Sequence, residues 1–464
     1  MRLPSPRSSF VALALALALL AAPAPALAAP PKADPPPALR LAIQRATLDN
    51  GLRVVMNVDH ASNAVALAVT YDVGARDEAP GEGGFVRLFE HLLFGATKHL
   101  AAGEFESLVA ARGGFVTAKS TVDRAAYSMI VPENELALGL WLEAQRMRGV
   151  DLQQAAIDAD GKALAIVDHV PYGKTVVRLR ALAFEGCPAY AHGTSGADLA
   201  RADLAAVRAF HAAHFGPNTA VLGISGDFDP DMAMSLVHRH FDDIARIQAK
   251  PFAEPAVPEQ TAERREVVED ALARATALSY GFVMPKLGTR EHDALRFAQV
   301  ILGDGEGSRL VARLVRADAL AMEARAEVDA RFGRGPGLFR VEVRLAQNAA
   351  VPEVEKRVDA ALKELADAPP TEAETIRARK RLEAAFVLGL ASNRNRAVEL
   401  GKHELWNGDA RAIGRELERL ATVTPSDVQK AAVQYLTTKR RTVIETRPKP
   451  ASAGNVAAVA EGSR

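Results

Sequence analysis

The two halves of this 464-residue chain repeat one order of elements, and this repeat restricts the possible folds more than any other feature. In each half, two β-forming segments precede an apolar helix, and the half closes on a helix followed by a strand. These segments are 47–56, 65–71, 85–94, 207–215 and 220–224 in the first half, and 267–268, 275–282, 294–302, 428–436 and 442–444 in the second. We therefore expect two copies of one α/β unit.

Proline-rich polar stretches divide the chain between and beside these copies. They mark linkers because proline interrupts helices and strands. The predicted organisation is a signal peptide at 1–28, a Pro/Ala-rich leader at 29–43, an N-terminal domain at 44–245, a linker at 246–262, a C-terminal domain at 263–447 and a tail without periodic pattern at 448–464.

The first residues are typical of an export signal. Arg2 and Arg7 precede an apolar run over 10–22, and the small residues of 26–28 form a cleavage site. That run is shorter than the roughly 20 residues of a spanning helix, and prolines close it. We expect a periplasmic or secreted protein, cleaved after Ala28, whose mature chain has no membrane anchor.

The net charge of the chain gives no indication of a nucleic-acid partner. Lys and Arg together number 57, as do Asp and Glu, so the formal net charge is zero and nothing calls for nucleic acid. Cys187 is the single cysteine, and the chain cannot form an intrachain disulfide.

The helix predicted over 85–94 carries the candidate chemistry. Its apolar residues follow the helical period and leave Arg87, Glu90 and His91 on the other side. In the inverted zinc motif His-x-x-Glu-His, the two histidines bind the metal and the glutamate is the general base. Here arginine stands at the first ligand position, and arginine has no lone pair for a metal. Taken alone, an Arg-Glu pair three residues apart is usually only a solvated ion pair.

Short motifs along the chain make the sequence resemble the insulinase, or pitrilysin, family of inverted-motif zinc peptidases, over about residues 48–448. It looks most like bacterial two-domain members with the layout of mitochondrial processing peptidase. The matching motifs lie at 48–52, 73–78, 90–94, 113–114, 216–218, 226–230, 308–310 and 423–428. The resemblance implies an α+β fold of two homologous sandwich domains, each a mainly antiparallel sheet packed with helices.

The resemblance also identifies what has been lost. The family's third zinc ligand is a glutamate 77 residues after the last motif histidine, and it corresponds to Asp168. A second family acid corresponds to Gly161, with Asp160 beside it. Only His91 is an unchanged zinc ligand. We expect the Arg87 guanidinium to occupy the zinc position and to pair with Asp168, and with Glu90 as a further partner.

Two further parts of the family's site have counterparts in this chain. Arg316 matches an arginine that holds the substrate carbonyl, whereas the accompanying tyrosine falls on Met322 or Glu323. The edge strand that aligns the substrate backbone corresponds to 114–118, so the resemblance suggests Phe115 and Thr117 as substrate-binding residues. Since strand addition needs mainly backbone groups, peptide binding can outlive catalysis.

Two functions remain open on this evidence. The first is an exported, catalytically inactive insulinase-family homologue without a cofactor, which binds peptides, acts as a scaffold, or partners an active paralogue or a second copy of itself. The alternative is an active zinc metalloendopeptidase with altered ligands, His91 and Asp168. In that case zinc would be the cofactor, and Glu90 would have to serve both as the base and as a further ligand, with water filling the gap.

Overall fold

The computed structural model describes residue 39 and residues 41–165 and 170–449. The predicted signal peptide, most of the leader, most of the tail and Asp168 lie outside the described residues. No helix in the described part of the chain is long and apolar enough to cross a membrane.

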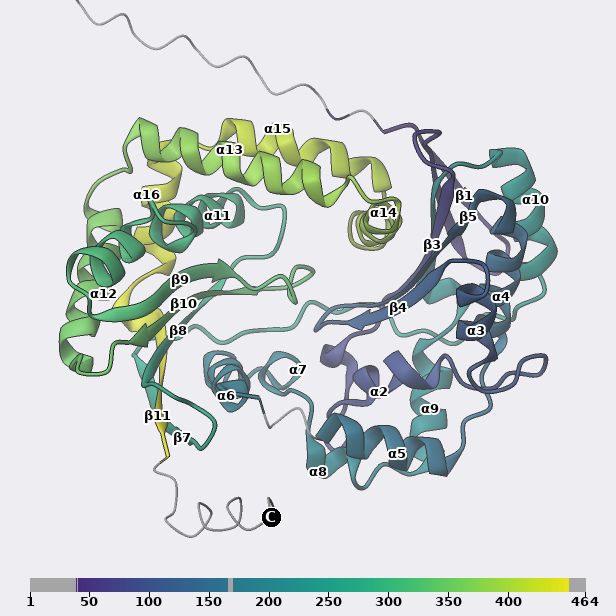
Figure 1. The fold of residues 1–464 in the computed structure, drawn as a ribbon, viewed down its shortest axis with the longest axis horizontal. Coiled ribbons are helices and arrows are strands. Elements are labelled where there is room, and N and C mark those ends of the chain that lie inside the picture. The colour runs from purple at the N-terminus through teal and green to yellow at the C-terminus, as the bar shows by residue number, and fades with distance from the viewer. Residues whose placement is uncertain (1–38, 40, 166–169, 450–464) are drawn as a thin grey trace, which may run out of the picture. The chain divides into compact units, whose positions relative to one another are not determined.

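The first sheet has six strands, and most of its neighbours are antiparallel (Figure 1). The strands are β1 (Ile43–Thr47), β2 (Arg53–Val58), β3 (Ala64–Tyr71), β4 (Phe115–Ser120), β5 (Ala125–Pro132) and β6 (Ala220–Gly226), in the order β1-β2-β6-β3-β5-β4. Only β2 and β6 run parallel. The predicted hairpin around Asn50-Gly51 joins β1 to β2, and Gly51 has the positive φ of 89° that glycine tolerates in such a turn.

The second sheet repeats the order of the first without a counterpart of β1. Its strands are β7 (Arg264–Asp270), β8 (Ala277–Met284), β9 (Ala321–Val328), β10 (Gly337–Leu345) and β11 (Arg441–Pro448), in the order β7-β11-β8-β10-β9. The parallel pair is β7 with β11, as β2 with β6 in the first sheet, and the other pairs are antiparallel. The predicted α+β fold with two related units is confirmed. The predicted domain boundaries stay predictions.

Helices account for most of the remaining chain. They are α2 (Phe85–Leu92), α3 (Glu104–Ala110), α4 (Leu136–Arg148), α5 (Gln154–Ala165), α6 (Gly173–Ala183), α7 (Pro188–Ala191), α8 (Gly196–Leu199), α9 (Leu204–His214), α10 (Pro230–Phe241), α11 (Arg290–Gly303), α12 (Val351–Asp367), α13 (Glu372–Gly389), α14 (Asn393–Asn407), α15 (Arg415–Thr422) and α16 (Pro425–Tyr435). The segment Val311–Ala317 is a π-helix.

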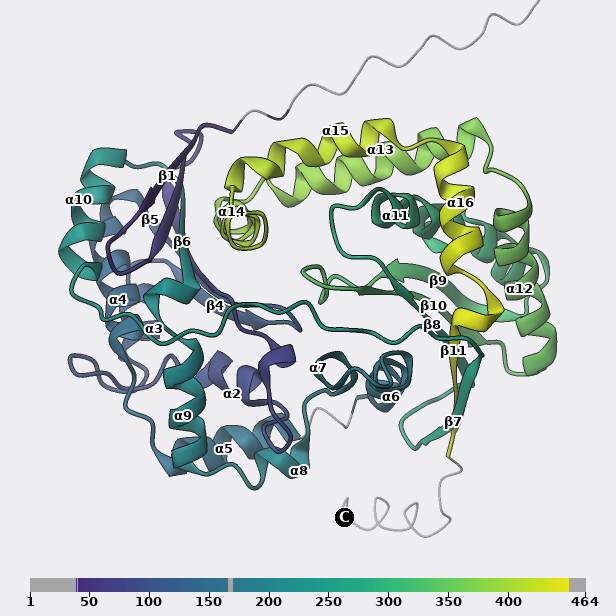
Figure 2. The ribbon, with the colours of Figure 1, turned by 180° about the vertical axis from the view of Figure 1, so that it is seen from behind.

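Each half lends one helix to the sheet of the other half. Helix α14 packs on β3 and β6 of the first sheet, and α6 packs on β8 and β11 of the second (Figures 1 and 2). The approach of α14 is close, because a Cβ at Gly223 would lie 2.3 Å from the carbonyl oxygen of Ala397. Between α6 and β11, the hydroxyl oxygens of Thr175 and Thr446 lie 2.5 Å apart in a buried hydrogen bond. Each sheet is therefore packed against a helix that comes from the other half of the chain.

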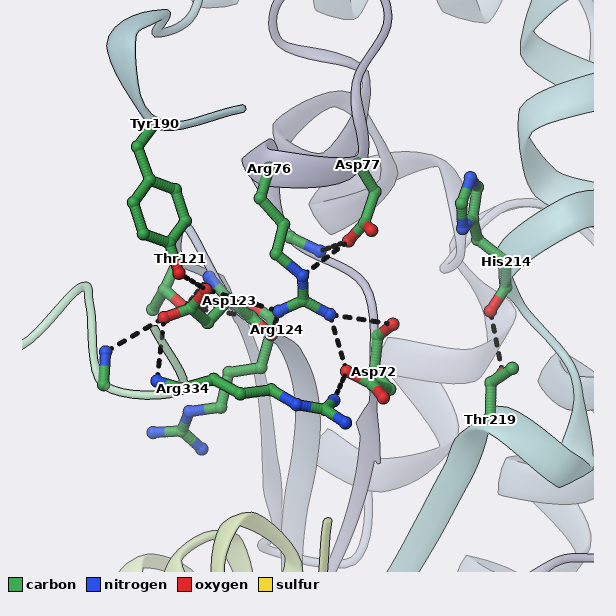
Figure 3. Close-up of polar contacts among 12 residues, drawn as sticks. Asp72, Arg76, Asp77, Thr121, Asp123, Arg124, Tyr190, His214, Thr219 and Arg334 are labelled. Atoms are coloured by element: carbon green, nitrogen blue, oxygen red, sulfur yellow. Dashed lines mark hydrogen bonds and ion pairs between the residues drawn. The ribbon is translucent and has the colours of Figure 1, made fainter. Parts of the chain in front are cut away.

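A buried polar cluster fixes the turn between β4 and β5. The carboxylate of Asp123, which is fully buried, accepts hydrogen bonds from the hydroxyl of Tyr190 at 2.8 Å and from the amides of Gly333 and Arg334 at 2.9 and 3.1 Å (Figure 3). The buried guanidinium of Arg76 donates to the backbone carbonyl of Asp123. Because the last two amides belong to the loop between β9 and β10, this cluster joins the end of β4 to the second half of the chain.

Candidate functional site

Helix α2 presents the motif residues as its sequence period predicts. The helix starts after Gly84, whose φ of 107° lies in the left-handed region, and its apolar face is buried in the core beneath the first sheet. On the opposite side, Arg87 and Glu90 are partly buried and His91 is exposed. The motif therefore lies on a surface-facing side of a well-packed helix.

The carboxylate of Glu90 is bound to the end of β4. One of its oxygens accepts a hydrogen bond of 2.8 Å from the backbone amide of Ser120 and another from the Ser120 hydroxyl. In the described part of the chain, no ion pair joins Glu90 to Arg87. The structure differs here from the expected pairing, because Ser120 reaches the carboxylate from the neighbouring strand, which a helix-period argument cannot show. The expected pair of Arg87 with Asp168 lies outside the described residues.

His91 and Glu90 line a cavity of about 410 Å³ that continues along β4. Asp160 lines the same cavity from α5, so the acid noted beside Gly161 does reach the site. Burial raises the pKa of the Asp160 carboxyl, while the nearby imidazole of His91 lowers it. In the sequence, the only indication for Asp160 was its position next to Gly161. Its approach to the site could not be predicted, because the contact between α5 and α2 depends on tertiary packing.

The described residues do not fit a zinc ion. Catalytic zinc takes three protein ligands from His, Cys, Asp or Glu. Over residues 41–165 and 170–449, no group of three such side chains is placed to hold a metal ion. Arg87 occupies the first ligand position without a lone pair, and the Glu90 carboxylate is already bound to Ser120. The roles of His91 and Asp168 as metal ligands stay predictions.

Strand β4 is an edge strand, as expected, and pairs only with β5. The Ser120 amide points away from β5, toward Glu90. Backbone groups two residues apart in a strand point the same way, so the amides and carbonyls of Val116 and Ala118 also point outward. Both residues line the cavity beside His91. A row of outward backbone groups therefore borders this cavity.

The suggested substrate-binding side chains lie near this edge, with one exception. Phe115 has 52% of its surface exposed and faces the guanidinium of Arg394, 5.5 Å from the ring centroid, and Thr117 lines the cavity. Arg316 is exposed on the π-helix, and Met322, at the start of β9, is 59% exposed. Neither lines the cavity around His91. Arg316 therefore does not reach this cavity, and its role as a substrate-binding residue stays a prediction.

Arg87 lines a second cavity, of about 310 Å³, with Arg180 of α6 and with Ser120. Arg180 is buried, and its Nε and Nη2 atoms have no hydrogen-bond partner among the described residues. The sequence analysis missed this residue. An arginine in a helix carries no motif, and only its burial beside a cavity distinguishes it.

The two related sheets, the helix α2 with its arginine-containing motif and the edge strand beside it match the fold of the inverted-motif zinc peptidases. Residues 53–179 match the family model described as insulinase (peptidase family M16), and residues 201–382 match the one described as peptidase M16 inactive domain. The two models cover more than half of the chain, and the chain belongs to the insulinase family.

Curated relatives span almost the same length. The chain is 25% identical to the zinc protease PqqE of Helicobacter pylori over 417 residues, 87% of this chain and 92% of the relative. It is 27% identical to an uncharacterized zinc protease of Mycobacterium bovis over 420 residues, 89% of this chain and 94% of the relative. These relatives are named as zinc proteases.

Solved structures show the same fold. A protease from Helicobacter pylori superposes with a TM-score of 0.82 at 24% identity, covering 88% of this chain and 100% of that one. A peptidase M16 inactive domain from Pseudomonas fluorescens gives 0.79 at 17% identity, covering 88% and 98%. The first half of the periplasmic protease PqqL from Escherichia coli gives 0.71 at 14%, covering 89% and 94%.

Proposed function

We propose that this protein is a non-catalytic member of the insulinase family that binds extended peptides along the edge strand β4. The observation that carries this proposal is the motif helix itself. Arg87 stands where the first zinc ligand belongs, and a guanidinium cannot coordinate a metal. The family's third ligand, moreover, has become an aspartate, which is one methylene shorter.

The state of Glu90 supports the same conclusion. A general base must reach the water that it activates. Here the Glu90 carboxylate accepts two hydrogen bonds from Ser120, which hold it against β4. The residue therefore acts as a clamp between α2 and the end of the edge strand, which keeps that strand in place.

The geometry of β4 supports peptide binding. An added strand pairs with outward backbone groups, and those of Val116 and Ala118 border the cavity of about 410 Å³. Strand addition depends little on side chains, so the replacement of the zinc ligands does not impair it. Thr117 and the exposed ring of Phe115 lie on the same face of β4 and provide side-chain contacts along one face of the added peptide.

Location and partners form part of the proposal. The apolar run over 10–22, with Arg2 and Arg7 before it, supports export to the periplasm. A chain that binds peptides without cleaving them suits the role of partner to an active paralogue with an intact His-x-x-Glu-His motif. Co-purification from the native host, with identification of the captured family member, tests this role.

The alternative is an active metalloendopeptidase that uses His91 and Asp168 as ligands. The names of the curated relatives, which are zinc proteases, favour it. It requires Glu90 to leave Ser120 and to activate a metal-bound water. Metal analysis of the purified protein, together with a peptide-cleavage assay with and without chelator, separates the two functions. We expect no stoichiometric zinc and no cleavage. A stoichiometric zinc content with chelator-sensitive cleavage would overturn our proposal.

Peptide binding is tested on β4 itself. In Ala118→Pro, the chain loses one outward amide while the pairing of β4 with β5 keeps its hydrogen bonds, and proline is tolerated on edge strands in this position. We expect this variant to lose affinity for a fluorescent extended peptide in an anisotropy titration. The matched control, Ala118→Val, keeps the amide and should bind as the wild type does. Equal binding by both variants would exclude strand addition at this edge.

A further inference from the structure

The cavity on the other side of α2 is strongly cationic. It has a volume of about 310 Å³, and Arg87, Arg180 and Arg331 line it. Among its described lining residues, Glu78 is the only carboxylate. The cavity begins where β4 ends, because Ser120, Thr121 and Val122 form part of its wall.

Arg180 is the central cation. Only 7% of its surface is exposed, and its Nε and Nη2 atoms are buried without a hydrogen-bond partner among the described residues. Burial, together with the nearby Arg331, lowers the pKa of Arg180 to about 10. The absence of a side chain at Gly193 makes room for the guanidinium, since a Cβ there would lie 2.9 Å from Nη2. The Nε of Arg87 is likewise buried and without a partner in the described part of the chain.

The two described carboxylates that act on Arg180 are engaged elsewhere. Glu78 accepts from the amide of Val86 at 2.9 Å and faces the imidazole Nε2 of His192 at 3.1 Å. Asp329 accepts from Arg331 Nε at 2.8 Å. A buried guanidinium without a hydrogen-bonded anion is costly to the folded protein. Among the described residues, the cavity therefore offers an anion buried guanidinium donors that no carboxylate occupies.

Part of the cavity wall is apolar. Val122, Val176 and Val177 contribute aliphatic surface, so the cavity favours an anion that carries an aliphatic group over a bare inorganic ion. A carboxylate, like a phosphate, pairs with a guanidinium through two parallel hydrogen bonds, and the carboxylate is the one of the two that an unmodified peptide carries. The last residue of a peptide with an aliphatic side chain combines both features.

We propose that this cavity binds the C-terminal carboxylate of a peptide that is added along β4, with the aliphatic side chain of its last residue among the valines. The proposal rests on the peptide binding proposed above and assigns that site its substrate class. The charge determines the direction of the peptide. An amino terminus would be repelled by Arg87 and Arg180, whereas a carboxyl terminus beside Ser120 requires a chain that runs parallel to β4.

A pair of peptides tests this without any variant. The two share one sequence that ends in valine and carry a fluorophore at the amino end. One has a free C-terminal acid and the other a C-terminal amide, and both are titrated with the wild-type protein. Hydrogen bonds to a buried charge predict at least about tenfold tighter binding of the acid. Equal binding of both peptides would overturn this inference and leave strand addition standing, whereas binding of neither peptide would overturn the proposed function as well.

Variants then locate the effect. Arg180→Met should bind the acid only as well as the amide. The control Arg178→Met lies on the same helix, is exposed and pairs with Glu266 at 2.6 Å outside the cavity, so it should keep the preference. An unchanged preference in Arg180→Met, in protein with a native circular dichroism spectrum, would overturn the proposal. A preference for the acid that is seen only in Asp168→Asn would also overturn the proposal, because it would mean that the carboxylate of Asp168 fills the cavity in the wild-type protein.

Discussion

Replacement of Asp123 by alanine should destabilise the protein more than any exposed charge change. The carboxylate is fully buried, and its loss leaves the hydroxyl of Tyr190 and the amides of Gly333 and Arg334 without their acceptor (Figure 3). Removing one partner from a buried ionic cluster costs about 3–5 kcal/mol. We expect a value within that range rather than above it, because Arg76 keeps its other acceptors, among them the carboxylate of Asp72 at 2.6 Å.

Denaturant unfolding followed by circular dichroism at neutral pH measures this loss. Asp367→Ala is the control, because it removes an exposed i,i+4 pair with Lys363, which should contribute no more than about 1 kcal/mol. Asp123→Asn keeps one acceptor and should fall between the two. A decrease of less than about 1 kcal/mol in the free energy of unfolding of Asp123→Ala would refute the reasoning, since it would mean that the cluster contributes little net stability. Because the cluster holds the turn after β4, Asp123→Ala should also weaken peptide binding.

Three further variants have defined outcomes. Arg87→His restores two histidines one helical turn apart, and zinc titration should show weak binding, whereas tight binding with peptide cleavage would mean that the arginine alone silenced a complete site. The hydrogen bond to Glu78 raises the pKa of His192. The contribution of this bond to the free energy of unfolding is therefore present below about pH 6.5 and is lost as the pH rises through the raised pKa. This pH dependence should be absent in His192→Gln. Burial lowers the pKa of His211, which packs on Phe89, to about 4. The free energy of unfolding should therefore decrease as the pH falls from about 6.5 toward 4, and it should decrease less steeply in His211→Leu. For either histidine, identical pH profiles of the variant and the wild type would contradict the assignment.

The elements and their repeat could be predicted from the sequence because they depend on local period. The apolar residues of α2 recur at helical spacing, and the Asn50-Gly51 pair specifies a tight turn whatever surrounds it. The parallel pairing of β2 with β6 and of β7 with β11 could not be predicted in this way, since it joins segments more than 150 residues apart. The exchange of α6 and α14 between the sheets is equally non-local.

The same division applies to the site. The sequence alone determined the residue at each motif position, including an arginine at position 87 where the His-x-x-Glu-His motif has its first histidine, because the ability to bind a metal belongs to the side chain itself. What those side chains contact was decided only by the tertiary structure. Packing brings Ser120 to Glu90, Asp160 toward His91 and Arg180 to the cavity that Arg87 lines. These contacts depend on where distant segments come to lie, and a hydrogen bond or a buried charge exists only once the chain has folded.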